Sequence, residues 1–114
     1  MIGTIVTLGG GGFSMSADGS SAIDDHILGM TGRSRPRVCF VPTASGDADS
    51  YSERFEAAFA GRAETSVLSL FCREPWGYSD PQVLLDQGVI YVGGGSTANL
   101  LAVWRLHGLP SVLQ

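Results

Sequence analysis

The amino-acid sequence predicts an α/β domain with a mostly parallel sheet of about four strands. Short apolar runs alternate with helix-like segments four times along the chain, and glycine clusters follow the first run and the last. The last run, residues 89–92, is continuously apolar, as in strands with both faces buried. Strands that alternate with helices are typical of parallel sheets with right-handed crossovers. The 114 residues contain no repeat or linker, so we expect a single domain over residues 1–114.

The first predicted strand covers residues 2–8 and ends in four glycines. A helix follows, with Ser20 as its N-cap residue and Gly32 just beyond its end. Its apolar residues recur at intervals that place them on one face, namely Ile23, Ile27 and Met30. Its polar face carries Asp24, Asp25 and His26, which we expect to be solvated.

The second predicted strand covers residues 38–41 and continues into a Pro-Thr-Ala-Ser-Gly loop at residues 42–46. The next helix covers about residues 49–60, and its aromatic residues recur every four positions, namely Tyr51, Phe55 and Phe59. The third predicted strand covers residues 65–71, before a loop at residues 73–79. The aromatic residues of that loop, Trp76 and Tyr78, are candidates for a ligand lip or for a cover over the sheet edge.

The last predicted strand lies between two helices. Asp80 and Pro81 indicate a helix start, because aspartate caps free N–H groups and proline suits the first turn, and Gly88 ends this short helix. The strand at residues 89–92 leads through three glycines into a helix at residues 98–107, which ends at Gly108. The apolar face of that helix consists of Leu100, Val103 and Trp104.

Composition excludes several functional classes. The net charge is −4 and lysine is absent, so no basic stripe exists for nucleic acid. No apolar run approaches the ~20 residues that span a bilayer, and we expect no membrane association and a cytoplasmic location. Cys39 and Cys72 lie in separate apolar runs, where we expect buried free thiols. Neither a zinc-type spacing nor a cofactor motif occurs, so we expect no metal site and no cofactor.

The first glycine cluster, residues 9–12, does not fit a nucleotide-binding motif. The GxGxxG spacing would require a third glycine at Ser14 or Met15, and a P-loop would require a lysine. A tight turn that lets the first helix pack close to the sheet is one interpretation. A ligand-facing role within a larger site is the other.

The second cluster, Gly93 to Gly95, joins an apolar strand to a helix that Ser96 or Thr97 caps. Backbone N–H groups at such a helix start can hold a developing negative charge, as in an oxyanion hole. The alternative is that these glycines only allow the turn. His107 lies in the last turn of the same helix, where a structural role with the helix dipole is expected.

Three motifs in order along the chain resemble the peptidase E and cyanophycinase family of serine peptidases. They are Leu-Gly-Gly-Gly-Gly at residues 8–12, Phe-Val-Pro-Thr-Ala-Ser at residues 40–45, and Gly-Gly-Gly-Ser-Thr-Ala-Asn-Leu-Leu at residues 93–101. The resemblance covers essentially the whole chain. Ser96 stands where the family more often has asparagine.

The resemblance implies a three-layer α/β/α fold of the class I glutamine amidotransferase-like type and hydrolysis of peptide bonds next to aspartate. It implies that the N–H groups of Gly94 and Gly95 stabilise the oxyanion. It also places six residues at the substrate, namely Gly10, Gly11, Thr43, Ser45, Ser96 and Thr97. The family's nucleophilic serine lies in a Gly-x-Ser-Ala-Gly motif on a later strand, and no Gly-x-Ser-x-Gly occurs in these 114 residues.

Two hypotheses follow. In the first, the chain is the N-terminal half of a serine hydrolase for Asp-containing peptides, truncated before its nucleophile and inactive alone. In the second, it is a shortened, non-catalytic relative that binds a small acidic ligand or a partner chain. In either case we expect a homo-oligomer or association with the missing half, because the helix face of Leu100, Val103 and Trp104 would be only partly covered.

Overall fold

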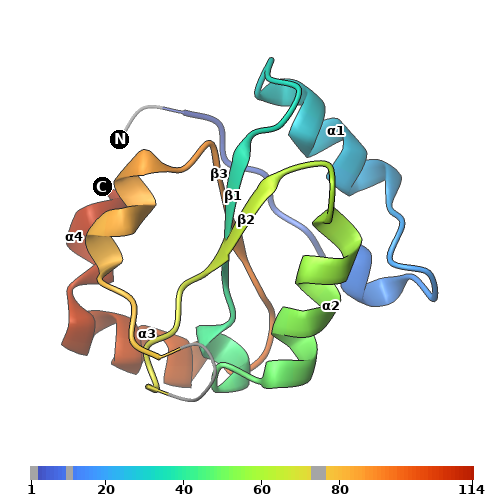
Figure 1. Ribbon diagram of the computed structural model, residues 1–114. Coiled ribbons are helices and arrows are strands. Elements are labelled where there is room, and N and C mark those ends of the chain that lie inside the picture. The colour runs from blue at the N-terminus through green and yellow to red at the C-terminus, as the bar shows by residue number, and fades with distance from the viewer. Residues whose placement is uncertain (1–2, 10–11, 73–76) are drawn as a thin grey trace.

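The computed structural model describes residues 3–9, 12–72 and 77–114. Three strands form one parallel sheet in the order β2-β1-β3: β1 (Arg37–Val41), β2 (Glu64–Val67) and β3 (Val89–Val92) (Figure 1). In the central strand, Val38 is in register with Thr65 on one side and with Val89 on the other. The predicted parallel α/β class is therefore confirmed.

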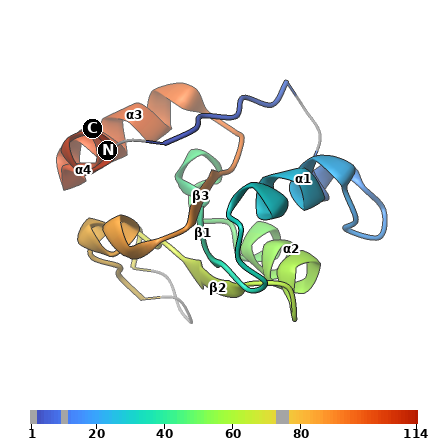
Figure 2. The same cartoon turned by 90° about the horizontal axis from the view of Figure 1, so that it is seen from above.

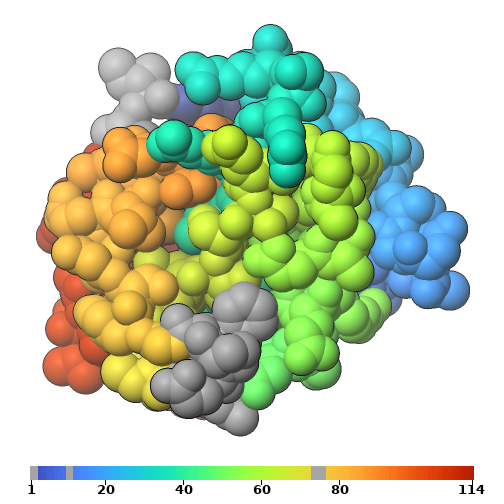
Figure 3. Space-filling view, viewed as in Figure 1, coloured from blue at the N-terminus to red at the C-terminus, as the bar shows by residue number. Residues whose placement is uncertain are grey.

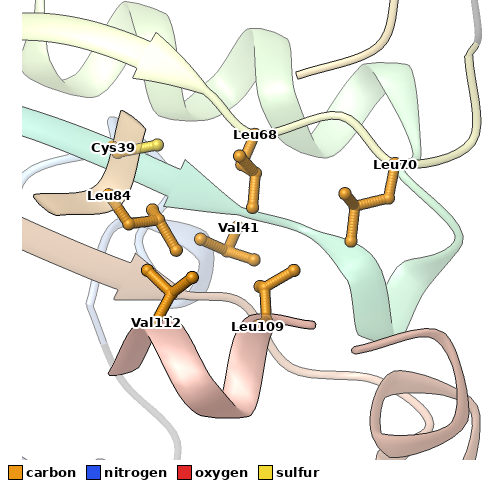
Figure 4. Close-up of a cluster of buried hydrophobic side chains, with 7 residues drawn as sticks. All are labelled: Cys39, Val41, Leu68, Leu70, Leu84, Leu109 and Val112. Atoms are coloured by element: carbon orange, nitrogen blue, oxygen red, sulfur yellow. The ribbon is translucent and has the colours of Figure 1, made fainter. Parts of the chain in front are cut away.

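The side chains of β1 point alternately to two hydrophobic clusters, which makes the fold three-layered. One cluster is largely aromatic and consists of Phe13, Val38, Phe40, Phe55, Phe59 and Ala63. The other is mainly aliphatic and consists of Cys39, Val41, Leu68, Leu70, Leu84, Leu109 and Val112 (Figure 4). Because Val38 and Phe40 face one side while Cys39 and Val41 face the other, the central strand is buried on both faces.

Each face of the sheet has its own helices (Figure 2). The aromatic side carries the 3-10 turn η1 (Phe13–Met15), α1 (Ala22–Met30) and α2 (Asp49–Phe59). The aliphatic side carries the 3-10 helix η3 (Pro81–Asp86), α3 (Thr97–His107) and α4 (Leu109–Leu113). A further turn, η2 (Thr43–Ser45), follows β1. The space-filling view shows β2 reaching the surface between η3 and α2 (Figure 3).

The predicted first strand is wrong for the residues that the structure describes. Residues 3–9 form no strand, and Ile5 in this segment is 89% exposed. The described part of the chain therefore has three strands instead of about four. A β-branched run has strand propensity, but a strand exists only when a neighbour pairs with its backbone, and these residues have no such partner among those described.

The first helix is confirmed, but its inward face differs from the prediction. Its N-cap is Ser21, whose hydroxyl accepts from the Asp24 N–H. Asp24 is buried, whereas Ile23 and Met30 are exposed. The Asp24 carboxylate accepts hydrogen bonds from the Tyr91 hydroxyl and from the Phe13 N–H, so polar contacts orient the helix.

The third strand ends earlier than predicted, at Val67. The Leu68 N–H still donates to the Phe40 carbonyl, but the N–H groups of Leu70 and Phe71 donate to the Asp47 carboxylate. Because a side chain takes these donors, the parallel ladder stops although Leu68 and Leu70 remain buried. Cys72, expected to be buried, is exposed, and both cysteines are free.

The short helix α4 is a feature that the sequence pattern did not predict. Gly108, at a φ of 76°, ends α3 and directly precedes α4. Pro110 occupies the first turn of α4, where proline is tolerated. Leu109 and Val112 then complete the aliphatic cluster (Figure 4). In the described part of the chain, no helix has the length and apolar character needed to cross a membrane.

Candidate functional site

The candidate site lies at the carboxyl edge of the sheet, where the loops after all three strands meet. The loop after β1 contains η2 and Asp47, and the loop after β3 contains the three glycines before α3. The loop after β2 is bound to the first of these loops through the Asp47 carboxylate. Parallel sheets place ligands at this edge, because the strands end there together and the helices begin there.

Backbone contacts hold the glycine elbow, residues 93–95, against η2. The Ser96 N–H donates to the Ala44 carbonyl at 2.8 Å, and the Gly93 N–H donates to the Val41 carbonyl at 3.1 Å. Gly95 has a φ of 145°, and a Cβ at this position would lie 2.3 Å from the Ala44 oxygen. Only glycine fits there, so the close approach of two backbones fixes the elbow.

Gly94, in contrast, faces open space. It is exposed, and a Cβ added to it would meet no atom within 4 Å. Its N–H donates to the Tyr51 hydroxyl at an N···O distance of 3.3 Å, which is long for such a bond. The elbow thus leaves Gly94 in open surroundings, while Gly93 is buried and a side chain on Gly95 would meet Ala44.

The residues at the start of α3 add to this donor site. The Ser96 side chain accepts from the Asn99 N–H at 3.3 Å and so caps the helix. Ser96 and Thr97 are both exposed. The positive end of the α3 dipole therefore lies directly after Gly94 and Gly95, which favours an anionic group at this position.

The hydroxyl groups of η2 form hydrogen bonds within the chain. Thr43 is buried, and its Oγ1 accepts from the Trp104 indole N–H at 3.0 Å. The Ser45 hydroxyl donates to the Pro42 carbonyl at 2.9 Å and accepts from the Ala48 N–H. These bonds shape the turn that supports Gly95. The substrate-binding roles predicted for Thr43, Ser45, Ser96 and Thr97 stay predictions.

The first glycine cluster is described only in part, because Gly10 and Gly11, like Trp76, lie outside the described residues. Gly12 is buried at a φ of 74°, and a Cβ there would lie 2.2 Å from the Tyr91 hydroxyl oxygen. The Tyr91 hydroxyl donates to Asp24 Oδ1 at 2.9 Å. Burial raises the pKa of Asp24 above its ordinary value of 3.8, and burial together with the Asp24 charge raises the pKa of Tyr91.

Sequence reasoning missed two aspartates of this region. Asp24 was expected to be solvated, but it anchors α1 beside Gly12. Asp47 is buried at a φ of 56° and accepts from two backbone N–H groups and the Ser69 hydroxyl. The one signal available for Asp47 is its place directly after Gly46, because aspartate tolerates positive φ in tight turns.

Neither histidine contacts the glycine elbow in the described part of the chain. His107 is at the other end of α3, about 16 Å along an 11-residue helix, and its Nδ1 lies 3.2 Å from the Tyr78 hydroxyl. His26 is exposed on α1. Within residues 3–9, 12–72 and 77–114, no group of three or more His, Cys, Asp or Glu side chains could hold a metal ion.

Comparison with known proteins gives a match over nearly the whole chain. The model of peptidase family S51 matches residues 5–114. YgaJ of Bacillus subtilis strain 168, described as an uncharacterized peptidase, is 45% identical over 111 residues, which is 96% of this chain and 47% of that protein. The chain therefore spans about half the length of the curated relative it matches. No solved structure gives a significant match.

Proposed function

The chain belongs to peptidase family S51, as its motifs predicted, and we propose that it supplies the oxyanion-binding part of a serine peptidase active site. The proposed substrates are peptides cleaved next to aspartate, which the resemblance to peptidase E and cyanophycinase implies. One observation carries the proposal. Gly94 is exposed, its N–H meets the Tyr51 hydroxyl, and it lies at a strand-to-helix elbow that backbone contacts hold in place.

This geometry suits the chemistry of acyl transfer. When a nucleophile attacks a peptide carbonyl, negative charge develops on the carbonyl oxygen, and donors that are already oriented stabilise it without reorganisation. Gly94 has no side chain to block the approach of a substrate to its backbone. The N-terminus of α3 adds a favourable potential at the same place.

In this proposal the nucleophile and the base come from outside these 114 residues. Ser45 and Ser96 hydrogen-bond to backbone groups of their own loops, and His107 lies at the far end of α3. We therefore expect the 114-residue chain alone to have no serine hydrolase activity. Labelling by a fluorophosphonate probe that is lost on mutation of one serine of this chain would contradict this.

The test supplies the rest of the active site from YgaJ. In it, this chain replaces the matching 111 residues of YgaJ. We expect the resulting protein to hydrolyse an Asp-containing dipeptide faster than the matched Asn-containing dipeptide, with unmodified YgaJ as reference. Gly94→Val should lower kcat about 10²- to 10³-fold, the usual cost of one oxyanion donor, without loss of the thermal unfolding transition. Equal rates on both dipeptides would reject the aspartate preference, and a normal kcat in Gly94→Val would reject the oxyanion role.

A shortened relative that binds a small acidic ligand without cleaving it is the second candidate. The exposed start of α3 beside Gly94 favours this candidate, because a helix N-terminus can bind an anion without any nucleophile. N-acetylaspartate titrated into the 114-residue chain should then shift the amide signals of Gly94 and Gly95 in an NMR spectrum. Saturable shifts together with an inactive YgaJ replacement would favour this candidate over the enzyme.

Association with a second chain is also part of the proposal. Leu100 is buried, but Val103 and Trp104 are only half-buried against the aliphatic cluster, so that helix face is partly covered within the chain. Large apolar side chains are exposed elsewhere, with Leu106 81% exposed and Leu101 38% exposed. Sedimentation at micromolar concentration should show an oligomer that Leu106→Gln weakens and Leu85→Gln on η3 does not. A monomer would reject the homo-oligomer, and failure to bind the remainder of YgaJ would reject the association.

A further inference from the structure

Tyr51 contacts the same backbone donor on which the proposed function rests. It lies in the first turn of α2, and its hydroxyl oxygen accepts the Gly94 N–H at 3.3 Å. The Gly94 N–H is therefore not a free donor, because a phenol already occupies it. A substrate oxygen that arrives at this point either displaces the Tyr51 hydroxyl or accepts a hydrogen bond from it.

The packing of the Tyr51 ring argues against displacement. The ring lies edge-on to Phe40 with centroids 4.8 Å apart, and it contacts Phe13 at 5.8 Å. It also lies so close to Gly93 that a Cβ on that glycine would be 2.9 Å from Tyr51 Cε2. Neighbours on several sides hold the ring, whereas the hydroxyl hydrogen can still rotate about the C–O bond.

The hydroxyl also has a donor to spare. A tyrosine hydroxyl accepts hydrogen bonds and donates one, and within the described residues Tyr51 Oη accepts from Gly94 without donating to any acceptor. A hydroxyl that accepts from one group becomes a stronger donor to the next, because hydrogen bonds in a chain polarise one another. The Gly94 N–H thus strengthens the donor next to it.

We propose that Tyr51 is a further catalytic residue, whose hydroxyl donates a hydrogen bond to the oxyanion of the substrate while it accepts the Gly94 N–H. The Gly94 N–H then acts on the oxyanion through the Tyr51 hydroxyl, and Gly95 or other groups around the substrate supply the remaining hydrogen bonds. No bond to Tyr51 forms or breaks, and its proton stays on the phenol oxygen. This inference rests on the proposed function, because it assigns a residue to the same oxyanion site.

The test uses Tyr51→Phe in the YgaJ replacement described above. Phenylalanine keeps the ring against Phe40 and removes only the hydroxyl. We expect kcat and kcat/KM to fall together by about 10²-fold with KM unchanged, because the lost contact forms only in the transition state. Tyr91→Phe is the matched control, since it removes a tyrosine hydroxyl that contacts Asp24 and not the elbow, and it should keep the parent kinetics.

Each outcome decides the proposal. An active parent whose Tyr51→Phe variant has unchanged constants, or a raised KM alone, would overturn the role of Tyr51 and leave the proposed function standing. An inactive parent would reject the proposed function and this inference with it. In the 114-residue chain, Tyr51→Phe should also shift the Gly94 amide proton in an NMR spectrum more than the Gly108 amide proton. An unshifted Gly94 signal would show that the Gly94–Tyr51 hydrogen bond, on which the inference depends, is absent.

Discussion

The two glycine clusters of the chain differ in what surrounds them. A Cβ on Gly95 would lie 2.3 Å from the Ala44 carbonyl oxygen, which is a backbone atom beside a paired strand. A Cβ on Gly12 would lie 2.2 Å from the Tyr91 hydroxyl and 3.2 Å from an Asp24 oxygen, which are side-chain atoms. Side-chain tips can rotate away, whereas a backbone held by a sheet cannot. The second cluster is therefore part of the sheet framework, whereas Gly12 of the first cluster lies against side chains.

The same difference extends to the segments that precede the glycines. β3 pairs with the central strand along its length, so it delivers Gly93 to a fixed point. Residues 3–9 pair with no described strand, so side-chain contacts position Gly12, namely the Asp24–Tyr91 hydrogen bond and the burial of the adjacent Phe13 in the aromatic cluster. The paired strand therefore gives the second cluster a position in the sheet that residues 3–9 do not give to Gly12.

The largest expected effect is that of Gly95→Ala. The new methyl group would collide with the Ala44 carbonyl at a φ that side chains rarely adopt, and we expect a loss of about 3 kcal/mol or more in the free energy of unfolding. Urea unfolding of the purified chain measures this. Gly94→Ala is the matched control, and its open surroundings predict a change within about 0.5 kcal/mol. Equal losses in the two variants would contradict the difference between the adjacent glycines.

Gly12→Ala should have a smaller effect. The positive φ of 74° costs an alanine about 1 kcal/mol, and displacement of the Tyr91 hydroxyl from Asp24 costs about another 1 kcal/mol. Tyr91→Phe should lose only the second part, and adding Gly12→Ala to it should then cost less than in the wild type. A full additive loss in the double variant would show that Gly12 faces something other than the tyrosine hydroxyl.

The smallest effect, and the one that depends on pH, is expected for Asp24→Asn. Burial raises the pKa of Asp24 in the folded chain, so the native state binds this proton more tightly than the unfolded state. The stability from this group is present below the ordinary pKa of 3.8 and is lost as the pH rises through the raised value. Because an asparagine side chain cannot ionise, the variant should gain stability relative to the wild type as the pH rises above the ordinary pKa of 3.8.

Urea unfolding at several pH values checks this expectation. Asp86→Asn, which changes an exposed carboxylate on η3, is the control. A stability difference between Asp24→Asn and the wild type that does not change with pH would show that Asp24 ionises in the folded chain as it does in water. The contact beside Gly12 would then be an ordinary polar anchor.

Local sequence signals were sufficient where each element's own residues decide its structure. The strand at residues 89–92, the cap formed by Asp80, a cap at Ser96 or Thr97 and the glycines just beyond two helices, Gly32 and Gly108, were readable in advance. So was the contact of α2 with the sheet through aromatic residues at intervals of four. Capping and periodicity act over a few residues, so a single sequence contains them completely.

Long-range contacts decided the remainder. Whether residues 3–9 pair with a strand, which face of α1 turns inward and where β2 ends all depend on partners far away in sequence, such as Tyr91 for Asp24 and Leu70 for Asp47.

The candidate site also has a part that local sequence signals predict and a part that long-range contacts decide. The sequence by itself determined that Gly93 to Gly95 would form an elbow before a capped helix, because glycine and serine impose local backbone geometry. Only the tertiary structure placed Ala44 behind Gly95 and the Tyr51 hydroxyl on Gly94, because hydrogen bonds between segments so far apart along the chain form only when the sheet brings them together.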